Sequence, residues 1–276
     1  MTVEANAKVN LTLEVFAPRA DGYHALRSVV MPVSLRDTLE IEVADGLSSD
    51  AGYDDDLCLR AARTLREARG VSFGARIHVV KRIPVGGGLG GGSADAAATL
   101  VALNGLWRLG MTRAELAELG AQVGSDVPAL ALGGAVLMEG RGERVGRISG
   151  GAFPSLDLVL AAPRVPSSTA RVYAACLPRH ESSPDASAAM VAALRTGDRA
   201  AIAASFTNDL QDAATRLCPA IGDALSALRE AGARGVSMSG SGSAVFGLVS
   251  SELEGRAIAA ELERAGFWAR HARTVG

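Results

Sequence analysis

A glycine-rich run between a predicted strand and a predicted helix is the strongest chemical signal in the sequence. Because glycine has no Cβ, such a run lets backbone N–H groups converge on an anion, and the dipole of the following helix adds to the attraction. A flexible linker is the alternative, but it is unusual between a β-branched strand and a long helix. The run therefore predicts a phosphate site, formed by Pro84, Val85, Gly86, Gly87, Gly88, Leu89, Gly90, Gly91, Gly92, Ser93 and Ala94.

The residues after the glycines narrow the kind of phosphate site. They contain no Gly-Lys-Ser/Thr, so the loop differs from that of P-loop nucleotide triphosphatases. The string Gly86-x-Gly88-x-x-Gly91 matches a dinucleotide fingerprint. However, the region about 20 residues further on is predicted to be helical, where that fingerprint requires the end of a second strand. We therefore give the dinucleotide match little weight.

Two charged residues elsewhere have chemistry to offer beside a phosphate. Asp126 lies in Gly124-Ser125-Asp126-Val127-Pro128, which fits a helix N-cap or a general base aimed at a hydroxyl, and alone favours the cap. Lys8 and Asn10 project from the polar side of a strand that alternates from residue 2 to residue 15. For Lys8 the alternative is a solvated strand face. Only two of the 28 basic residues are lysines, Lys8 and Lys81.

Two further segments are rich in turn-forming or small residues. Residues 237–246, Ser-Met-Ser-Gly-Ser-Gly-Ser-Ala-Val-Phe, predict a tight loop that lets the backbone approach a ligand or another domain. This loop has no nucleophile-elbow pattern and no histidine near it in sequence, which argues against serine hydrolase chemistry. In Asp21-Gly22-Tyr23-His24 the first two residues indicate a turn, and the two rings could stack on a base.

The elements that must position these residues are strands and helices in mixed order. We predict strands near 2–15, 25–35, 38–44 and 75–83, and helices over 55–69, from the glycine run to about 110, and over 112–123. A strand pair then reaches about 148. A loop at 149–151 predicts a boundary between domains 1–150 and 151–276. The second part has strands near 156–161, 234–239 and 243–249, several helices between 168 and 231, and a final helix and strand.

Composition excludes several classes of protein. The 276 residues carry a net charge of −2, which argues against a protein that coats nucleic acid or an anionic membrane. Hydrophobic residues make up 48% of the chain, as in an ordinary globular α/β protein. Three scattered cysteines, and an N-terminus without an apolar block, predict a cytoplasmic protein in a reducing environment. No two histidines have ligand spacing, so we predict no structural metal.

Taken in order, these motifs resemble the kinase superfamily named for galactose, homoserine, mevalonate and phosphomevalonate, the GHMP kinases. The resemblance covers residues 3 to about 250. It implies an α+β fold of two domains, the first like domain 2 of ribosomal protein S5 and the second ferredoxin-like, with the active site in the cleft between them. The Asp-Gly-Tyr-His turn and the glycine loop are similar to those of the branch whose acceptor alcohol is a cytidyl diphosphate of methylerythritol, an intermediate of isoprenoid biosynthesis by the non-mevalonate route.

The resemblance also implies roles for individual residues. Asp126 would take the proton from the acceptor's 2-hydroxyl, and Lys8 would stabilise the charge. The glycine loop would hold the phosphates of ATP, with Mg²⁺ offsetting their charge and Ser93 as the suggested metal ligand. Lys81 would reach nucleotide oxygens or pack over the purine. Substrate contacts would come from Asn10, Tyr23, His24, Thr169 and Tyr173, with the two tyrosines on either side of the cytosine and the histidine at its edge.

The sequence departs from the family pattern at three positions. Asp56 stands where relatives place an asparagine near the adenine, and a carboxylate cannot donate to a ring nitrogen. Ala94-Asp95 replaces a more usual Ser-Asn pair, which puts a carboxylate in the first turn of the helix. Tyr173 stands where a phenylalanine is familiar, which preserves stacking.

Two other functions are left open by the residues. One is a superfamily kinase with a homoserine, mevalonate or sugar acceptor, and the other is a nucleotide-binding module without catalysis. We expect small-molecule substrates as the only partners, with no nucleic acid and no membrane, and a monomer or weak homodimer.

Overall fold

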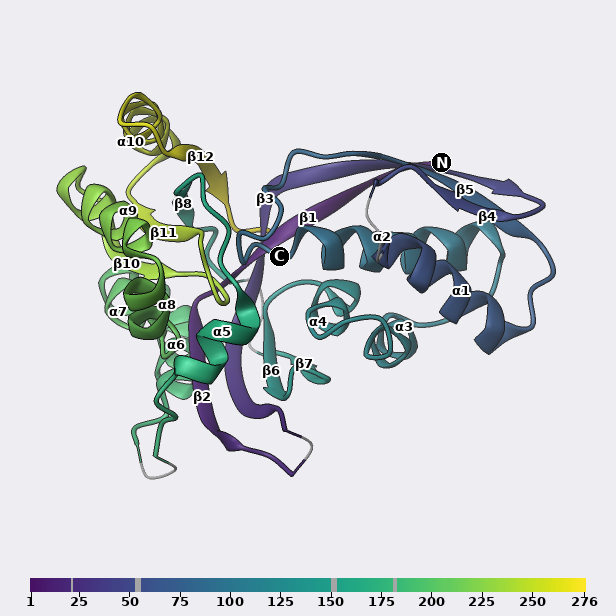
Figure 1. The fold of residues 1–276 in the computed structure, drawn as a ribbon, viewed down its shortest axis with the longest axis horizontal. Coiled ribbons are helices and arrows are strands. Elements are labelled where there is room, and N and C mark those ends of the chain that lie inside the picture. Colours follow the sequence, from purple (N-terminus) through teal and green to yellow (C-terminus); the bar gives the residue numbers. More distant parts are fainter. Residues whose placement is uncertain (21, 53–55, 150–152, 181–182) are drawn as a thin grey trace.

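The first half of the chain is a sheet with helices on one side of it. The computed structural model describes residues 1–20, 22–52, 56–149, 153–180 and 183–276. Its elements up to residue 147 are β1 (Thr2–Asn10), β2 (Thr12–Pro18), β3 (His24–Ala44), β4 (Leu47–Ser49), α1 (Leu57–Arg69), β5 (Gly74–Val80), α2 (Gly91–Leu106), α3 (Arg113–Gly120), α4 (Val127–Leu132), β6 (Val136–Gly140) and β7 (Arg144–Arg147). Figure 1 shows α1 to α4 gathered beneath the long strands β1 and β3.

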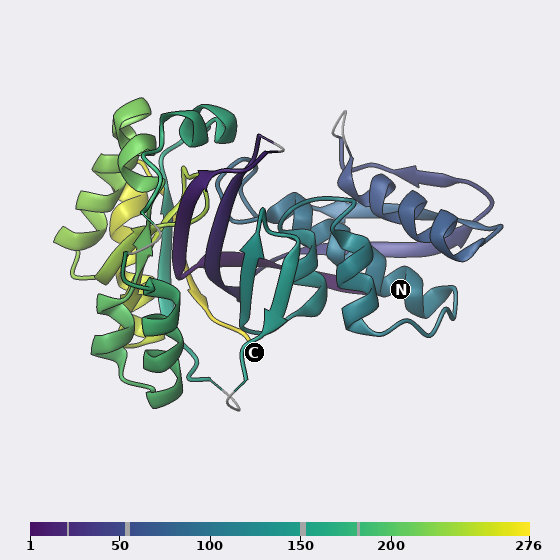
Figure 2. The ribbon, with the colours of Figure 1, turned by 90° about the horizontal axis from the view of Figure 1, so that it is seen from below.

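The second half adds a smaller sheet that helices cover. Its elements are β8 (Asp157–Ala162), α5 (Thr169–Ala175), α6 (Ala186–Thr196), α7 (Arg199–Ala204), β9 (Thr207–Asn208), α8 (Gln211–Leu217), α9 (Pro219–Glu230), β10 (Arg234–Met238), β11 (Val245–Val249), α10 (Glu252–Arg264) and β12 (Trp268–Arg273). Among the described residues these strands pair in the order β10-β11-β8-β12, all antiparallel. Figure 2 shows the green and yellow helices on the outer side of this sheet.

The long strand β3 organises the larger sheet. β1 and β2 both pair with it antiparallel, as do β5 and β6. β9, from the second half of the chain, adds a short parallel pairing to β2 through Thr12↔Thr207 and Leu13↔Asn208. The two halves are therefore joined by backbone pairing as well as by the chain connection. The predicted domain boundary at 150 falls on residues 150–152, outside the described residues.

Three of the predicted strands differ from the structure in their continuity. The single strand predicted over residues 2–15 is interrupted at Leu11, between β1 and β2. The two strands predicted over 25–35 and 38–44 are one continuous strand, β3. Alternation identified the apolar face correctly up to Asn6. From Ala7 to Val15 both faces are buried, because the second half of the chain packs over the polar side.

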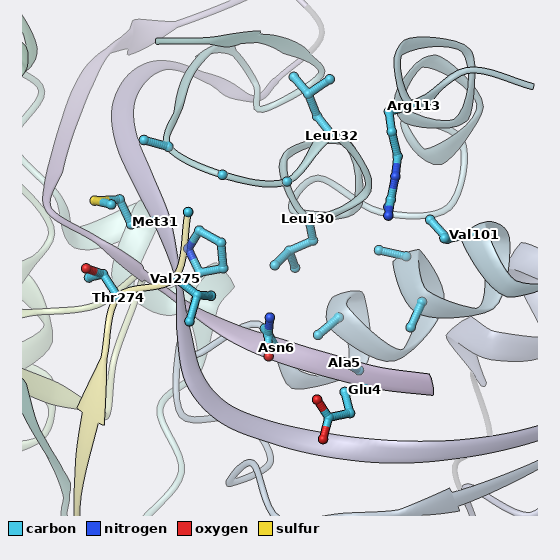
Figure 3. A pocket seen from close by; sticks show the side chains of 18 of the residues that line it. Glu4, Ala5, Asn6, Met31, Val101, Arg113, Leu130, Leu132, Thr274 and Val275 are labelled. Carbon is cyan, nitrogen blue, oxygen red and sulfur yellow. The ribbon is translucent and has the colours of Figure 1, made fainter. Parts of the chain in front are cut away.

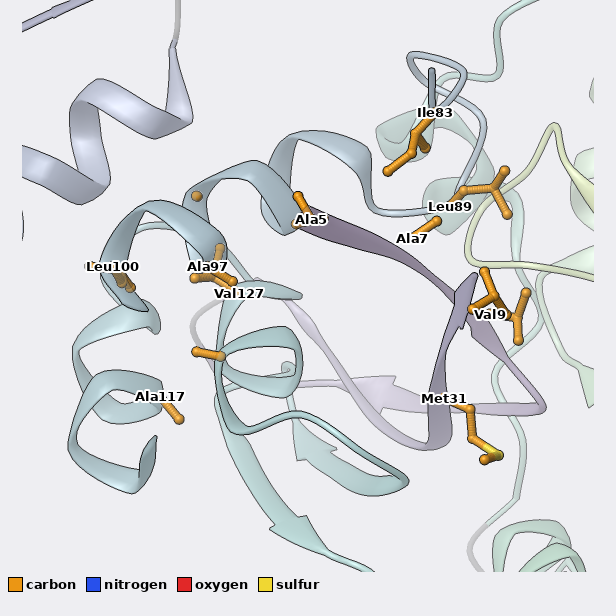
Figure 4. Packing of buried hydrophobic residues seen from close by; sticks show 14 of the residues in the cluster. Ala5, Ala7, Val9, Met31, Ile83, Leu89, Ala97, Leu100, Ala117 and Val127 are labelled. Atoms are coloured by element: carbon orange, nitrogen blue, oxygen red, sulfur yellow. The ribbon is translucent and has the colours of Figure 1, made fainter. Parts of the chain in front are cut away.

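The core of the first half lies between the sheet and α2. Small side chains of β1 and α2, such as Ala5, Ala7 and Ala97, let helix and sheet approach closely, and Leu100 and Val127 fill the remaining space. Figure 4 shows these groups, with Leu89 of the glycine loop next to Ala7 of β1. Leu89 is 1% exposed, so the loop is anchored to the core by its one large side chain. None of the described helices combines the length and apolar character needed to cross a membrane.

Candidate active site

One cavity collects most of the residues singled out in the sequence. Its volume is about 980 Å³, and both halves of the chain line it. The predicted site residues at its wall are Lys8, Asn10, Tyr23, His24, Asp56, Lys81, Pro84–Gly88, Gly90–Ser93, Asp126, Thr169 and Tyr173. Two residues of the predicted phosphate loop are absent from this wall: Leu89 is in the core and Ala94 faces another cavity. Asp21, in the predicted turn before Tyr23, lies outside the described residues.

A second cavity of about the same volume lies on the other side of α2. Figure 3 shows its wall, with Val101 of α2, Leu130 and Leu132 of α4, and Val275 near the C-terminal end. Its two arginines, Arg113 and Arg147, already donate to the carbonyls of Ala131 and Leu132. Apart from Ala94, none of the predicted site residues lines this cavity. The first cavity is therefore the candidate active site.

The glycine loop is held against a loop from the second half of the chain. The Ser239 hydroxyl donates to the Gly88 carbonyl at 3.0 Å, and the amide of Ala244 donates to Gly87 at 2.9 Å. A Cβ on Gly88, whose φ is +75°, would lie 2.2 Å from the backbone carbonyl oxygen of Ser239. Gly90, with φ +70°, begins α2 without a side-chain cap. These contacts explain why the segment 237–246 is built from small residues, as the sequence predicted for a loop approached by another domain.

Lys8 and Asp126 meet beside the start of α2. The Lys8 Nζ lies 3.4 Å from Asp126 Oδ2, and the side chains are 3% and 28% exposed. A Cβ on Gly90 would be 3.0 Å from Lys8 Cγ and 3.7 Å from Asp126 Oδ2, so the pair lies directly against the loop. The interpretation of Lys8 as part of a solvated strand face is excluded by its burial. A buried cation beside a partly exposed carboxylate suits the handling of a proton and a developing negative charge.

Asp126 occupies the N-cap position of α4, as the sequence suggested, but its side chain does not cap the helix. No backbone N–H of α4 donates to the carboxylate, and Pro128 stands where one donor would be. The carboxylate is therefore left to face Lys8 and the cavity. The segment thus combines features of both interpretations: its backbone starts a helix, and the Asp126 side chain stays available for chemistry.

A buried charge cluster joins the two ends of the glycine loop. Lys81 Nζ donates to Asp37 Oδ2 at 2.5 Å and to Asp95 Oδ2 at 2.6 Å. Asp37, which is fully buried, also accepts from the backbone of Arg82 and Ile83. Burial lowers the pKa of Lys81, but the hydrogen bonds to Asp37 and Asp95 outweigh it and raise the pKa overall. The ammonium is thus engaged within the protein, and its predicted contact with the nucleotide stays a prediction.

Asp95 is the less satisfied carboxylate of this cluster. Its Oδ1 is buried and has no partner among the described residues. Burial raises its pKa from 3.8 to about 7, the hydrogen bond and charge of Lys81 oppose this rise, and the charge of Asp37 adds to it. Burial is the largest cause of the rise in this pKa, and the second carboxylate bound to the same cation adds to it.

The raised pKa of Asp95 predicts a pH-dependent stability. Because the folded state holds a proton at Asp95 between pH 3.8 and about 7 and the unfolded state does not, unfolding free energy falls as pH rises through that window. Asp95→Asn removes this loss. As the pH is raised from about 5 to 8, the unfolding free energy of the variant should therefore increase by roughly 2–3 kcal/mol relative to that of the parent chain. Urea denaturation at several pH values measures this difference. Parallel stability curves for the two proteins would contradict the assignment. Asp198→Asn, at an exposed helix cap, serves as the control.

Asp56 caps α1 at the edge of the cavity. Its Oδ1 accepts from the amides of Cys58 and Leu59 at 2.8 and 3.3 Å. Aspartate and asparagine cap helices equally well, so this role does not depend on the charge of the carboxylate. Its predicted contact with adenine stays a prediction.

The aromatic residues gather at the other end of the cavity. The rings of His24 and Tyr173 have centroids 5.8 Å apart and an angle of 41° between them. Burial raises the pKa of the Tyr173 hydroxyl, so it stays protonated. Tyr23 is 58% exposed, and the Thr169 hydroxyl lies 2.7 Å from that of Ser241. The structure thus brings together the residues predicted to hold a base, from β3, α5 and the turn between β2 and β3.

Arg141 is a cavity residue that the sequence reasoning missed. It lies in the turn between β6 and β7, lines the cavity, and has its guanidinium 5.5 Å from the centre of the Tyr23 ring. Lys8 and Lys81 are paired with carboxylates, whereas Arg141 has no ion-pair partner among the described residues. The neighbouring Gly142 packs against Ser125, which places the turn next to Asp126. Its only sequence signal is the Gly-Arg-Gly string, which also fits an ordinary hairpin turn.

Comparisons with known proteins identify the family. The family model described as the N-terminal domain of GHMP kinases matches residues 56–134, and the model described as GHMP kinases C terminal matches residues 190–267. The 4-diphosphocytidyl-2-C-methyl-D-erythritol kinase of Pelotomaculum thermopropionicum is 44% identical, covering 96% of this chain and 94% of its own. That of Kineococcus radiotolerans is 43% identical, covering 100% of this chain and 89% of its own.

Solved structures give the same result. A crystal structure of 4-(cytidine 5'-diphospho)-2C-methyl-D-erythritol kinase has a TM-score of 0.86 and 38% identity, with both chains covered completely. A homoserine kinase from Cytophaga hutchinsonii, at 20% identity and a TM-score of 0.73, shares the fold. The two-domain GHMP-kinase fold expected from the motifs is thereby confirmed. The chain belongs to the GHMP kinases, within the family of 4-diphosphocytidyl-2-C-methyl-D-erythritol kinases.

Proposed function

We propose that this ATP-dependent small-molecule kinase transfers the γ-phosphoryl group of ATP to the 2-hydroxyl of 4-diphosphocytidyl-2-C-methyl-D-erythritol, a step of non-mevalonate isoprenoid biosynthesis. The observation that carries the proposal is the Lys8–Asp126 pair at the start of α2, with a phosphate loop beside it and an aromatic end in the same cavity. The cavity, at about 980 Å³, is at the upper end of the roughly 300–1,000 Å³ that small-molecule pockets span.

The catalytic step needs a base and a stabiliser of negative charge. Asp126 accepts the proton of the acceptor hydroxyl through the carboxylate that α4 leaves uncapped. Lys8 then faces both the carboxylate and the attacking oxygen, and its burial strengthens its electrostatic effect. The backbone amides of the glycine loop hold the phosphates in line with the hydroxyl. Positioning and electrostatics of this kind supply most of the catalysis in phosphoryl transfer.

Magnesium fits the proposed site with few protein ligands. Mg²⁺ keeps several waters and binds through one or two protein oxygens together with substrate phosphates. Ser93 lines the cavity in the first turn of α2, and a Cβ on Gly124 would lie 3.8 Å from its hydroxyl, so this oxygen lies between the loop and the Asp126 segment. We propose Ser93 as one ligand. When bound, the ion would offset the charge of the phosphates.

The hydrogen bonding of His24 suits recognition of cytosine. Its Nδ1 lies 2.8 Å from the carbonyl of Phe16, which can only accept, so Nδ1 carries the proton and Nε2 of the neutral ring is an acceptor. The amino group of cytosine is a matching donor. Tyr23 and Tyr173 supply ring faces for stacking on the base.

Arg141 is the proposed contact for the acceptor's diphosphate. This group links the cytidine to the methylerythritol, so it must lie between the aromatic end and Asp126, where Arg141 has no carboxylate partner among the described residues. Arg141→Ala should raise KM for the acceptor about tenfold to a hundredfold, with kcat and the KM for ATP within about threefold, because charge-assisted hydrogen bonds contribute about 1.5–3 kcal/mol. Arg144→Ala, an exposed arginine of the same hairpin, is the control. An unchanged KM for the acceptor would remove Arg141 from the site.

The proposed function is tested by substrate competition. ADP release from ATP should depend on the cytidyl acceptor and should stay near background with homoserine, mevalonate or galactose. ³¹P NMR of the product should show a phosphate monoester at the 2-position. Equal stimulation by one of the other alcohols would assign a different acceptor, and ATP binding without ADP release in any mixture would indicate a non-catalytic module.

A further inference from the structure

A chain of buried polar groups connects the second half of the protein to Lys8. Asn10, Ser28, Ser239 and Asn208 are at most 8% exposed. Buried polar groups are retained where their hydrogen bonds are satisfied, and such networks restrict side chains to one arrangement. The arrangement here ends at the ammonium of Lys8.

Asn208, in β9, holds the loop that follows β10. Its Nδ2 donates to the carbonyls of Met238 and Gly240 at 2.7 and 2.8 Å, and its Oδ1 accepts from the amide of Leu210 at 2.9 Å. The side chain thus uses both donors and one acceptor on backbone groups. Asn208 does not line the catalytic cavity. Its effect on the site must pass through the loop.

The loop in turn orients Asn10. The amide of Gly240 donates to Asn10 Oδ1 at 2.9 Å, and the Asn10 Nδ2 donates to the Ser28 hydroxyl at 2.8 Å. Ser28 donates its own proton to the carbonyl of Thr12 at 2.5 Å, so it can only accept from Asn10. This fixes which end of the amide is oxygen, and directs Oδ1 at Gly240 and Lys8.

Lys8 is held more closely by Asn10 than by Asp126. Its Nζ donates to Asn10 Oδ1 at 2.6 Å, compared with 3.4 Å to Asp126. A Cβ on Gly240 would lie 3.4 Å from the same Nζ, so the loop also covers the ammonium. With three donors in all, the ammonium keeps a direction toward Asp126 and the reacting oxygen only while Asn10 holds one of them.

We propose that Asn208 and Asn10 are positioning residues that aim the Lys8 ammonium at Asp126, so that the second half of the chain helps to build the catalytic pair. This inference rests on the proposed function. It gives Asn10 a role different from the substrate contact expected by resemblance. It gives Asn208 a role in catalysis although that residue touches no substrate.

Kinetics separate positioning from substrate contact. Asn208→Ala should lower kcat about tenfold to a hundredfold, because small misplacements of catalytic groups have effects of that size. The KM values for the acceptor and ATP should stay within about threefold, because Asn208 lies outside the cavity. Asn10→Ala should show the same split. A raised acceptor KM with unchanged kcat in Asn10→Ala would make Asn10 a substrate contact and overturn its positioning role.

The two-lysine composition gives a direct structural readout. With ¹⁵N-labelled lysine the chain has two Nζ signals, those of Lys8 and Lys81, which the Lys8→Arg variant assigns. Asn208→Ala should shift or broaden the Lys8 signal and leave that of Lys81 unchanged. Asn104→Ala is the matched control, since Asn104 also bonds backbone groups, at Met111, but is not connected to Lys8.

The outcomes are distinguishable. An unchanged Lys8 signal together with a kcat within about twofold of the parent would overturn the proposal. If Asn208→Ala does not fold, Asn10→Ala supplies both readouts. If the parent chain does not phosphorylate the cytidyl acceptor, the proposed function fails, whereas the NMR comparison still reports whether Asn208 positions Lys8.

Discussion

Replacing Asp126 with asparagine should lower kcat at least about a thousandfold, because a positioned general base contributes about 10²–10⁴ and the amide also loses the charge that faces Lys8. ATP binding should change less than about threefold, because the phosphates are held by the glycine loop. The fold should be unaffected, since the carboxylate of Asp126 makes no capping bond to α4. Steady-state kinetics, isothermal titration with an ATP analogue and a thermal melt together check the prediction.

The control for Asp126→Asn is Asp198→Asn. Asp198 caps α7 through the amides of Ala200 and Ala201, and asparagine caps equally well. The Asp198→Asn substitution removes one carboxylate at a site outside the cavity, so turnover should be unchanged. A kcat of Asp126→Asn within tenfold of the parent, about 1.4 kcal/mol, would mean that Asp126 is not the base.

Lys8→Arg should lower kcat at least about a hundredfold although the charge is kept. The side chain is 3% exposed and packed between the loop glycines, with a Cβ on Gly90 at 3.0 Å from its Cγ and one on Gly240 at 3.4 Å from its Nζ. A guanidinium is planar and wider than an ammonium, so it would displace the acceptor hydroxyl or the loop. The expected loss corresponds to about 2.7 kcal/mol of transition-state stabilisation.

The reverse exchange at an exposed site provides the comparison for Lys8→Arg. Arg82→Lys changes a side chain that bonds Thr38 at the surface, and turnover should be unchanged. Near-normal kcat in Lys8→Arg would show that only the charge is needed at position 8. The scarcity of lysine in the sequence would then have no bearing on the site.

Much of the site could be predicted from local sequence because its chemistry is local. The helices predicted over 55–69, after the glycine run and from residue 112 all occur, because neighbouring residues dictate their ends: Gly70 closes α1 and the capping box of Thr112 and Glu115 opens α3. Lys8 and Asn10 share a face because strand periodicity requires it. The fold followed from the order of the motifs, which resembles that of one superfamily.

What the sequence determined by itself was the set of groups: a phosphate loop, a lysine, an aspartate and rings for a base. Only the tertiary structure decided how they are used. Lys81 is paired with Asp37 and Asp95, Arg141 is left without a carboxylate among the described residues, and Asn10 holds Lys8, because residues up to 230 positions apart in the chain meet there. Burial and pairing depend on which distant element packs over a residue. Strand alternation could mark Lys8 as polar, but the glycine loop and the loop from the second half of the chain together bury it and direct its charge.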